Sequence, residues 1–208
     1  MTARMSPARD LATSLNLNGA HAVGLAVLLA LVGLPTLIGG ETAFAAGRYD
    51  RIAIADGEWW RLLSGHFVHF DRLHAAANLA GTVLVWALVG GRLRVLQWQM
   101  LLLPMAGGIS AALWWGSPMI TWYVGASGLL HGLLACGLLI GAFAHDRLAW
   151  LALAIMAGKL GVEQLRGAMP FAETLPVVTA AHLYGALLGL VAGLAWVLRA
   201  HRYNPGPR

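Results

Sequence analysis

Long stretches without a charged residue constrain this chain more than any other feature. No Asp, Glu, Lys or Arg occurs at 11–40, 73–91, 95–145 or 174–198. A helix that crosses a bilayer needs about 20 mostly apolar residues, so the stretch at 95–145 is long enough for two. Charged residues make up 11% of the chain, against about 25% in a typical soluble domain. The chain is therefore expected to be a membrane protein.

A sixth, weaker apolar segment lies at 148–165 and contains Lys159 and Glu163. The expected fold is an all-α polytopic membrane protein, a bundle of six transmembrane helices. The first span is longer than the hydrophobic region of a signal peptide and lacks a suitable cleavage motif, so it is expected to stay as an anchor. The predicted organisation is an N-terminal tail, one membrane domain and a C-terminal tail, at 1–18, 19–200 and 201–208.

The arginines indicate which ends of the helices face the cytoplasm. With a cytoplasmic N-terminus, the inner segments hold eight arginines and the outer segments hold five. Four of the outer five lie in one long loop at 40–72, together with five carboxylates. Because short inner loops carry the excess of Lys and Arg, both tails are expected in the cytoplasm.

Two connectors differ from short polar loops. The loop at 40–72 carries Trp59, Trp60 and Arg61, an aromatic and basic mixture that suits the lipid headgroup layer, so it is expected to contain an interfacial helix. The connector at 114–123 contains Gly and Pro but no charge, and is expected to dip into the protein.

Charge and cysteine content exclude other classes. The net charge of +5 comes without a basic cluster interleaved with surface aromatics, so no nucleic-acid partner is expected and the surroundings are the lipid bilayer. The single cysteine, Cys136, allows no disulfide within the chain.

A serine between glycines is the first candidate site. The stretch Gly125-Ala126-Ser127-Gly128 leads into the fourth predicted helix. A serine at a helix start has free backbone N–H groups around it, which can bind an oxyanion. The alternative is ordinary packing of small residues between membrane helices.

A histidine near the start of the last span is the second candidate. Histidine is rare in membrane helices and usually faces the bundle interior, so His182 marks a site by default. Glycines follow it at Gly185 and Gly189, and the fourth helix has matching glycines at Gly128 and Gly132. Close contact between these faces would bring His182 within hydrogen-bond reach of Ser127. The alternative is a histidine bonded to a neighbouring carbonyl.

Hydrogen-bond donors near the start of the second span form the third candidate. His74 and Asn78 are four residues apart and share a helix face, where both could donate to a developing negative charge. The alternative is a metal site formed by His66, His69 and His74. Their spacing matches no standard zinc pattern, and neither a metal nor another cofactor is expected.

Together these motifs resemble the rhomboid family of intramembrane serine proteases over 58–193. The family's Trp-Arg, His/Asn, Gly-x-Ser-Gly and Ala-His-x-x-Gly motifs fall on Trp60-Arg61, His74 and Asn78, Gly125–Gly128 and Ala181–Gly185. The resemblance implies Ser127 as nucleophile, His182 as general base, and His74, Asn78 and the Ser127 backbone N–H as the oxyanion hole. It implies supporting roles for Gly125, Gly128, His131, Gly132, Gly185, Gly189, Trp60, Arg61 and His69.

A narrower resemblance is to the rhombosortase branch, whose active-site block reads like Gly125-Ala-Ser-Gly-x-x-His131-Gly132. It implies cleavage of C-terminal Gly-Gly sorting signals on exported proteins, each followed by a transmembrane anchor. It also implies a bacterial inner-membrane protein whose active site faces the periplasm. A general rhomboid protease with other substrates is the alternative. His131 departs from the aromatic residue that many rhomboids have there. It could stack on or hydrogen-bond His182, or only pack.

The implied relay is a Ser127 and His182 dyad, because spans two, three, four and six contain no Asp or Glu. The fifth helix, interrupted by Lys159 and Glu163, could form a side entry to the site. The alternative is that these two residues, four apart, form a pair that only holds this helix in register. Two other classes remain. A transporter is expected to have inverted halves, which the sequence lacks. A non-catalytic binder of membrane proteins usually lacks the serine or the histidine.

Overall fold

A computed structural model describes residues 7–167 and 177–203. The predicted C-terminal tail therefore lies outside the described residues from 204 onward. Within the described parts the chain is almost entirely helical. In chain order, the elements are α1 (Pro7–Ser14), α2 (Gly19–Gly47), β1 (Tyr49–Asp50), α3 (Arg51–Ala55), α4 (Arg61–Ser64), α5 (Arg72–Val89), η1 (Gly90–Arg92), α6 (Val95–Gly116), β2 (Trp122–Tyr123), α7 (Ser127–Phe143), α8 (Arg147–Arg166) and α9 (Thr179–Tyr203).

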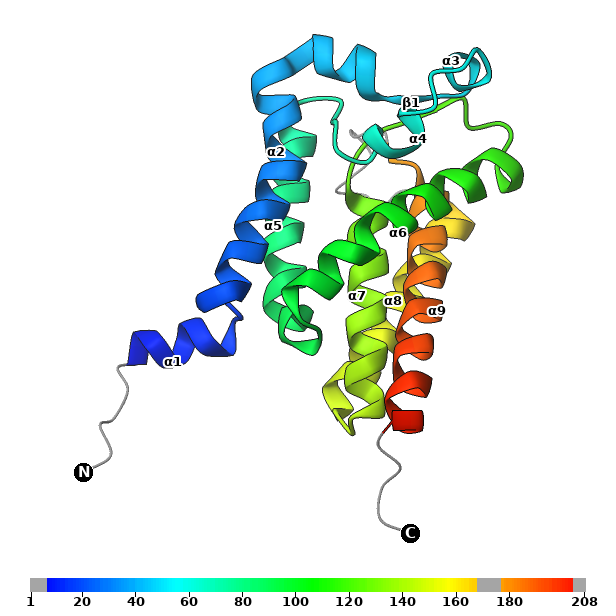
Figure 1. Cartoon of the computed structure of the whole chain (residues 1–208). Helices are drawn as coiled ribbons and strands as arrows, with labels where there is room; N and C mark the ends of the chain where they lie inside the picture. Colours follow the sequence, from blue (N-terminus) through cyan, green and yellow to red (C-terminus); the bar gives the residue numbers. More distant parts are fainter. Residues whose placement is uncertain (1–6, 168–176, 204–208) are drawn as a thin grey trace, which may run out of the picture.

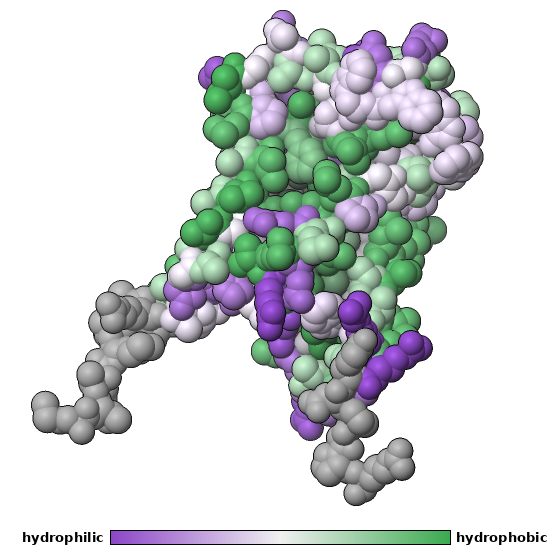
Figure 2. Space-filling view, in the orientation of Figure 1, coloured by the Kyte–Doolittle hydropathy of each residue, from purple (hydrophilic) through white to green (hydrophobic). Residues whose placement is uncertain are grey.

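Five helices are long and apolar enough to cross a membrane, namely α2, α5, α6, α8 and α9. The apolar helix α7 has 17 residues and is shorter. The chain is therefore a multi-pass membrane protein, and the count of six spans remains a prediction. The described chain ends lie at one end of the molecule and the long loop after α2 at the other (Figure 1). Hydrophobic side chains form a band between two more polar ends (Figure 2).

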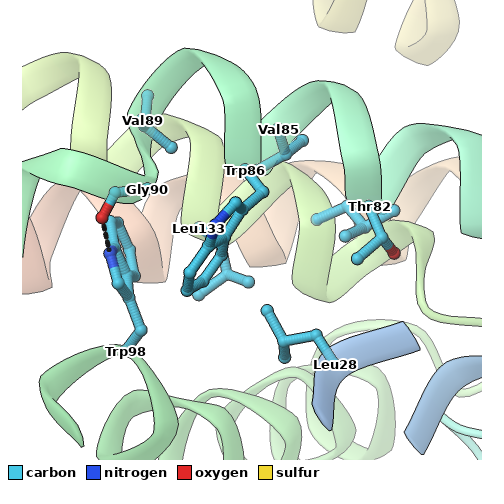
Figure 3. A pocket seen from close by; sticks show the side chains of 9 residues that line it. Leu28, Thr82, Val85, Trp86, Val89, Gly90, Trp98 and Leu133 are labelled. Atoms are coloured by element: carbon cyan, nitrogen blue, oxygen red, sulfur yellow. Dashed lines mark hydrogen bonds between the residues drawn. The ribbon is translucent and has the colours of Figure 1, made fainter. Parts of the chain in front are cut away.

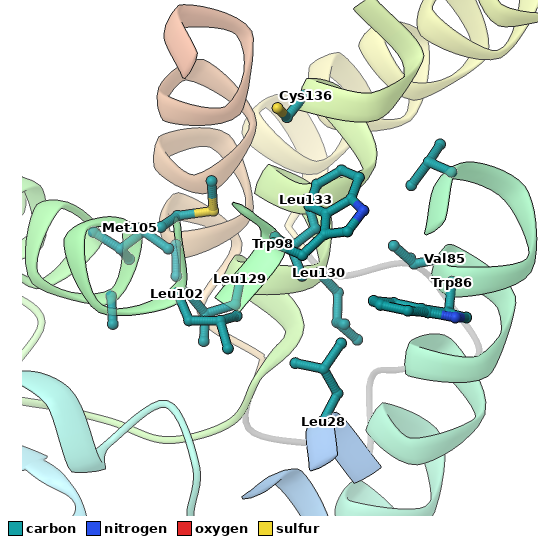
Figure 4. Packing of buried hydrophobic residues seen from close by; sticks show 14 of the residues in the cluster. Leu28, Val85, Trp86, Trp98, Leu102, Met105, Leu129, Leu130, Leu133 and Cys136 are labelled. Atoms are coloured by element: carbon teal, nitrogen blue, oxygen red, sulfur yellow. The ribbon is translucent and has the colours of Figure 1, made fainter. Parts of the chain in front are cut away.

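The helices form two groups joined by α6. Helices α7, α8 and α9 stand together, α2 runs beside α5, and α6 crosses between the groups (Figure 1). Where the groups meet, buried Trp86 and Trp98 pack with Leu28, Leu130 and Leu133 (Figure 4). The contact between the groups is therefore built from large apolar side chains.

A small pocket lies inside this core, and Thr82 is the only lining residue with a polar side chain other than the tryptophans (Figure 3). The Thr82 hydroxyl donates to the Asn78 carbonyl at 2.8 Å, and the Trp98 indole N–H donates to the Gly90 carbonyl at 2.8 Å. Because these polar groups are already bonded, the pocket is part of the packing and offers no group for chemistry.

The long loop after the first span is mostly structured. The backbone of α2 breaks at Gly40, where φ is +50° and ψ is −132°. Since a positive φ is unstrained only for glycine, Gly40 lets the following helical turn swing across the end of the bundle (Figure 1). The rest of the loop holds β1, α3 and α4.

Arg51 ties this loop to the connector after α6. β1 pairs antiparallel with β2, with Tyr49 opposite Tyr123. The Arg51 guanidinium donates to four carbonyls, those of Leu113, Trp114, Ser117 and Ile120. It thus binds carbonyls in the last turn of α6 and in the connector that follows, where the Leu113 carbonyl also accepts from the Ser117 N–H. Tyr123 is buried as expected for a connector that enters the protein, whereas the side chains of Trp115 and Met119 are 78% and 89% exposed.

The predicted contact between glycine faces of α7 and α9 is confirmed. A Cβ atom on Gly185 would collide with the Gly128 carbonyl oxygen, and one on Gly189 with the Gly132 carbonyl oxygen. The two backbones therefore touch, as small residues allow between membrane helices. This contact sets the position of His182, one turn before Gly185, relative to Ser127.

Candidate active site

Ser127 and His182 meet at the end of the bundle where α7 and α9 begin. Ser127 is the first residue of α7, and His182 lies in the first turn of α9. The Ser127 hydroxyl lies 2.8 Å from Nε2 of His182 and is placed to donate to it. His182 is 5% exposed, and Ser127 is half-buried. The pair predicted from sequence is thus within hydrogen-bond distance, with an accessible serine.

A tight turn at Gly125 presents Ser127. Gly125 has a φ of +108°, and a Cβ atom there would lie 2.7 Å from Nε2 of His74. Glycine is therefore needed for both its conformation and its size. The Gly125 N–H donates to the Gly65 carbonyl at 2.9 Å, and the buried Tyr123 hydroxyl donates to the Gly125 carbonyl. These bonds hold the turn against the long loop.

The predicted oxyanion donors lie on the buried face of α5. His74 and Asn78 are 4% and 5% exposed. The turn at Gly125 brings the His74 ring next to the serine loop. One N–H of the Asn78 amide donates to the His74 carbonyl at 2.9 Å, which leaves the second N–H for another acceptor. In the described part of the chain, Nδ1 of His74 and Oδ1 of Asn78 are buried without a partner.

A carboxylate reaches His182 from the fifth apolar helix, α8, and this corrects the expectation that no acidic residue would join the pair. Oε2 of Glu163 lies 3.0 Å from Nδ1 of His182, and Glu163 is 3% exposed. Spans two, three, four and six contain no acidic residue, and the spacing along the fifth helix indicated only Lys159 as a partner for Glu163. That ion pair is also present, at 2.8 Å between Nζ and Oε1. The signal that could have revealed Glu163 is that it is a carboxylate inside an apolar helix.

His131 stacks on His182, as one of the two sequence alternatives predicted. The ring centroids are 4.2 Å apart and the rings are inclined by 17°. Nδ1 of His131 donates to the Ser127 carbonyl at 2.7 Å, and Nε2 accepts from Lys159 at 2.7 Å. His131 is therefore tied to both α7 and α8.

Trp60 and Arg61 belong to the scaffold of the long loop. The Trp60 indole N–H donates to the Ala46 carbonyl at 3.0 Å. The Arg61 guanidinium is paired with Glu58 at 2.6 Å and also donates to the Ala45 and Arg48 carbonyls. These contacts fold the end of α2 back onto α4.

The other loop histidines bond to hydroxyl groups. His66 Nε2 donates to the Ser110 hydroxyl at 3.0 Å, and His69 Nδ1 accepts from the Thr36 hydroxyl at 3.2 Å. The His69 ring stands edge-on to that of His74, with centroids 5.1 Å apart. The only grouping of metal-type ligands among the described residues is instead His131, Glu163 and His182. The Lys159 ammonium bonds to Glu163 and His131, so it occupies the place of a cation between these ligands.

Burial of the loop histidines predicts a stability that depends on pH. Burial lowers the pKa of His66 and His69 from about 6.5 to about 4, with the neighbouring His74 as a smaller cause for His69. Between pH 6.5 and 4 the unfolded chain therefore binds protons that the folded chain does not. The free energy of unfolding should be constant above about pH 6.5 and fall below it, by up to roughly 3 kcal/mol for each imidazole.

This dependence is measured as the thermal midpoint in detergent from pH 8 to pH 4. The variant His69→Gln should flatten the slope below pH 6.5, whereas His201→Gln, at an exposed position on α9, should leave it unchanged. An equal slope in wild type and His69→Gln would contradict the assignment for His69.

Comparison with known protein families gives a match over most of the chain. A family model described as "Rhomboid domain" matches residues 56–199, more than two thirds of the chain. The match covers Ser127, Glu163 and His182. No curated protein matches the chain.

Proposed function

The chain belongs to the rhomboid family of intramembrane proteases, and from this membership we propose that it is an active serine endopeptidase. Ser127 is the nucleophile and His182 the general base. The observation that supports this assignment is the 2.8 Å separation of the Ser127 hydroxyl and His182 Nε2 within an apolar bundle. A relative that only binds membrane proteins does not need a serine and a histidine in hydrogen-bond contact. Here the close contact between the backbones of α7 and α9 brings these two side chains together.

The reaction is an acyl transfer through a covalent intermediate. His182 takes the hydroxyl proton while the Ser127 oxygen attacks the scissile carbonyl, and the proton then goes to the leaving amine. Donors from His74, Asn78 and the Ser127 backbone N–H hold the negative charge of the tetrahedral intermediate. Water, deprotonated by His182, attacks the acyl-enzyme and releases Ser127. An amine in place of water would give transfer instead of hydrolysis.

The proposed substrates are exported proteins with a C-terminal Gly-Gly motif, a transmembrane helix and a basic end. A membrane helix protects its backbone with its own hydrogen bonds, so cleavage requires local unwinding, and glycine weakens a helix by about 1 kcal/mol relative to alanine. The proposed location is the bacterial inner membrane in a six-span arrangement, with the site toward the periplasm. Both described chain ends lie at the same end of the molecule, which supports tails on one side of the membrane (Figure 1).

The test uses purified wild type, Ser127→Ala and His182→Ala in liposomes. One model substrate carries Gly-Gly before a transmembrane helix and a basic tail, and a matched substrate carries Leu-Leu instead. We expect cleavage near the glycines by wild type, none by either variant, and fluorophosphonate labelling of wild type but not of Ser127→Ala. An added mass on the product would identify transfer.

The outcomes separate the parts of the proposal. Equal cleavage of both substrates would leave the protease and refute the Gly-Gly preference. A wild type that reacts with the fluorophosphonate but cleaves neither these substrates nor general rhomboid substrates would also leave the serine catalyst and refute the Gly-Gly preference. A wild type that is neither labelled nor active would refute the protease and favour a non-catalytic binder.

A further inference from the structure

We infer that Glu163 is a positioning residue for His182, held by Lys159, in a closed ring of hydrogen bonds that starts and ends at Ser127. The inference rests on the proposed roles of Ser127 and His182. The ring runs from the Ser127 hydroxyl to His182, Glu163, Lys159, His131 and back to the Ser127 carbonyl, with distances of 2.8, 3.0, 2.8, 2.7 and 2.7 Å.

The chemistry of the charged pair fixes the direction of every bond in the ring. An ammonium only donates and an ionised carboxylate only accepts. Lys159 therefore donates to Nε2 of His131, which places the His131 proton on Nδ1, facing the Ser127 carbonyl. Glu163 accepts from Nδ1 of His182, which leaves Nε2 of His182 free to accept the serine proton. This is the tautomer that a general base must have.

Both oxygens of the Glu163 carboxylate are engaged, one by Lys159 and one by His182. The carboxylate therefore cannot rotate away from the imidazole without losing its counter-ion. The nearly parallel ring of His131 covers one face of the same imidazole at 4.2 Å. His182 is thus held by a hydrogen bond at one edge and by a stacked ring on its face.

The net charge of the ring explains how a carboxylate is kept inside an apolar bundle. An unpaired charge is costly there, whereas the pair of Lys159 and Glu163 is neutral overall. The Lys159 ammonium also lies 3.3 Å from Nδ1 of His182, but Nδ1 carries the proton directed at Glu163 and cannot accept from it. When Nε2 receives the serine proton, Glu163 faces the positive imidazolium and stabilises it while its own charge is retained.

The kinetic test replaces Glu163 by glutamine, which keeps the size and removes the charge. We expect kcat to fall roughly 100-fold or more with KM within about twofold, since loss of the acidic residue costs about 10⁴-fold in well-studied serine proteases. Glu163→Asp keeps the carboxylate one methylene shorter and should retain intermediate activity. Leu165→Ala, at an 86% exposed position on the same helix, is the matched control and should behave as wild type.

A second variant separates positioning from stability. Glu163→Gln alone leaves the Lys159 ammonium without its counter-ion, so Lys159→Met/Glu163→Gln removes both charges together. This double variant should unfold close to the wild-type temperature and still show the low kcat. Wild-type kcat in either folded variant would overturn the inference.

Proton NMR of histidine-labelled protein tests the ring without any substrate. The His182 Nδ1–H bonded to Glu163 should give a resonance far downfield in wild type and in Ser127→Ala, and lose it in Glu163→Gln. No such resonance in wild type would overturn the inference even in an active enzyme. A wild type that shows the resonance but neither cleaves substrate nor reacts with the fluorophosphonate would refute the proposed protease and leave the ring supported.

Discussion

Replacing Gly189 by alanine should force α7 and α9 apart and lower the free energy of unfolding by about 3 kcal/mol. The added methyl group would collide with the Gly132 carbonyl oxygen, which is backbone and cannot turn aside as a side chain can. Because His182 lies on α9 and Ser127 on α7, the same shift should separate the hydroxyl from Nε2. We therefore expect a large loss of proteolytic activity together with the loss of stability.

The matched control is Gly161→Ala on α8. A Cβ atom on Gly161 has no neighbour within 4 Å, so this variant makes the same substitution in an apolar helix without a collision. Its thermal midpoint should be unchanged or slightly higher, because alanine favours helix over glycine. The measurement is thermal unfolding in detergent for both variants, with cleavage assayed alongside. Equal midpoints for the two would show that the α7 and α9 backbones are not in contact.

Replacing Lys159 by methionine should produce the second large effect. The Glu163 carboxylate is 3% exposed and would lose its counter-ion, a change that typically costs about 3–5 kcal/mol for a buried pair. The Lys159 side chain is 29% exposed, so the lower end of that range is expected. Methionine preserves the length and the apolar stem, which limits the change to the lost charge and its hydrogen bonds.

A double-mutant cycle identifies the cause. In Lys159→Met/Glu163→Gln no charge remains to be paired, so stability should recover by most of what Lys159→Met loses. Additive losses would mean that the two side chains do not interact. Thermal unfolding of the four proteins in one detergent provides the cycle, and the folded fraction is checked by size-exclusion chromatography.

Most residues of the proposed site could be predicted from the sequence, because each departs from the pattern of its neighbours along the chain. Ser127 stands between glycines, His182 is a polar residue in an apolar helix, and His74 and Asn78 repeat at helical spacing. The glycines at Gly185 and Gly189 also follow a helical period, which identifies a face that another backbone can approach. Such features depend only on neighbours along the chain.

The contact of Glu163 with His182 could not be predicted from the sequence. Its spacing from Lys159 explains an ion pair on one helix and says nothing of a third partner. Whether the carboxylate reaches His182 depends on the rotation of α8 about its axis and on its height beside α7 and α9. The four bonds of Arg51 to the end of α6 and to the connector that follows are likewise contacts between distant segments.

The class of this protein follows from its sequence, because uncharged stretches of membrane-spanning length admit few folds other than a helical bundle. The residue types at the site and the glycine faces that bring α7 and α9 together follow from the sequence as well. Only the packing of the helices shows that Glu163 and Lys159 reach His182, and it selects stacking for His131. The reason is physical: helical periodicity fixes which side chains share a face, whereas the packing of whole helices fixes which faces meet.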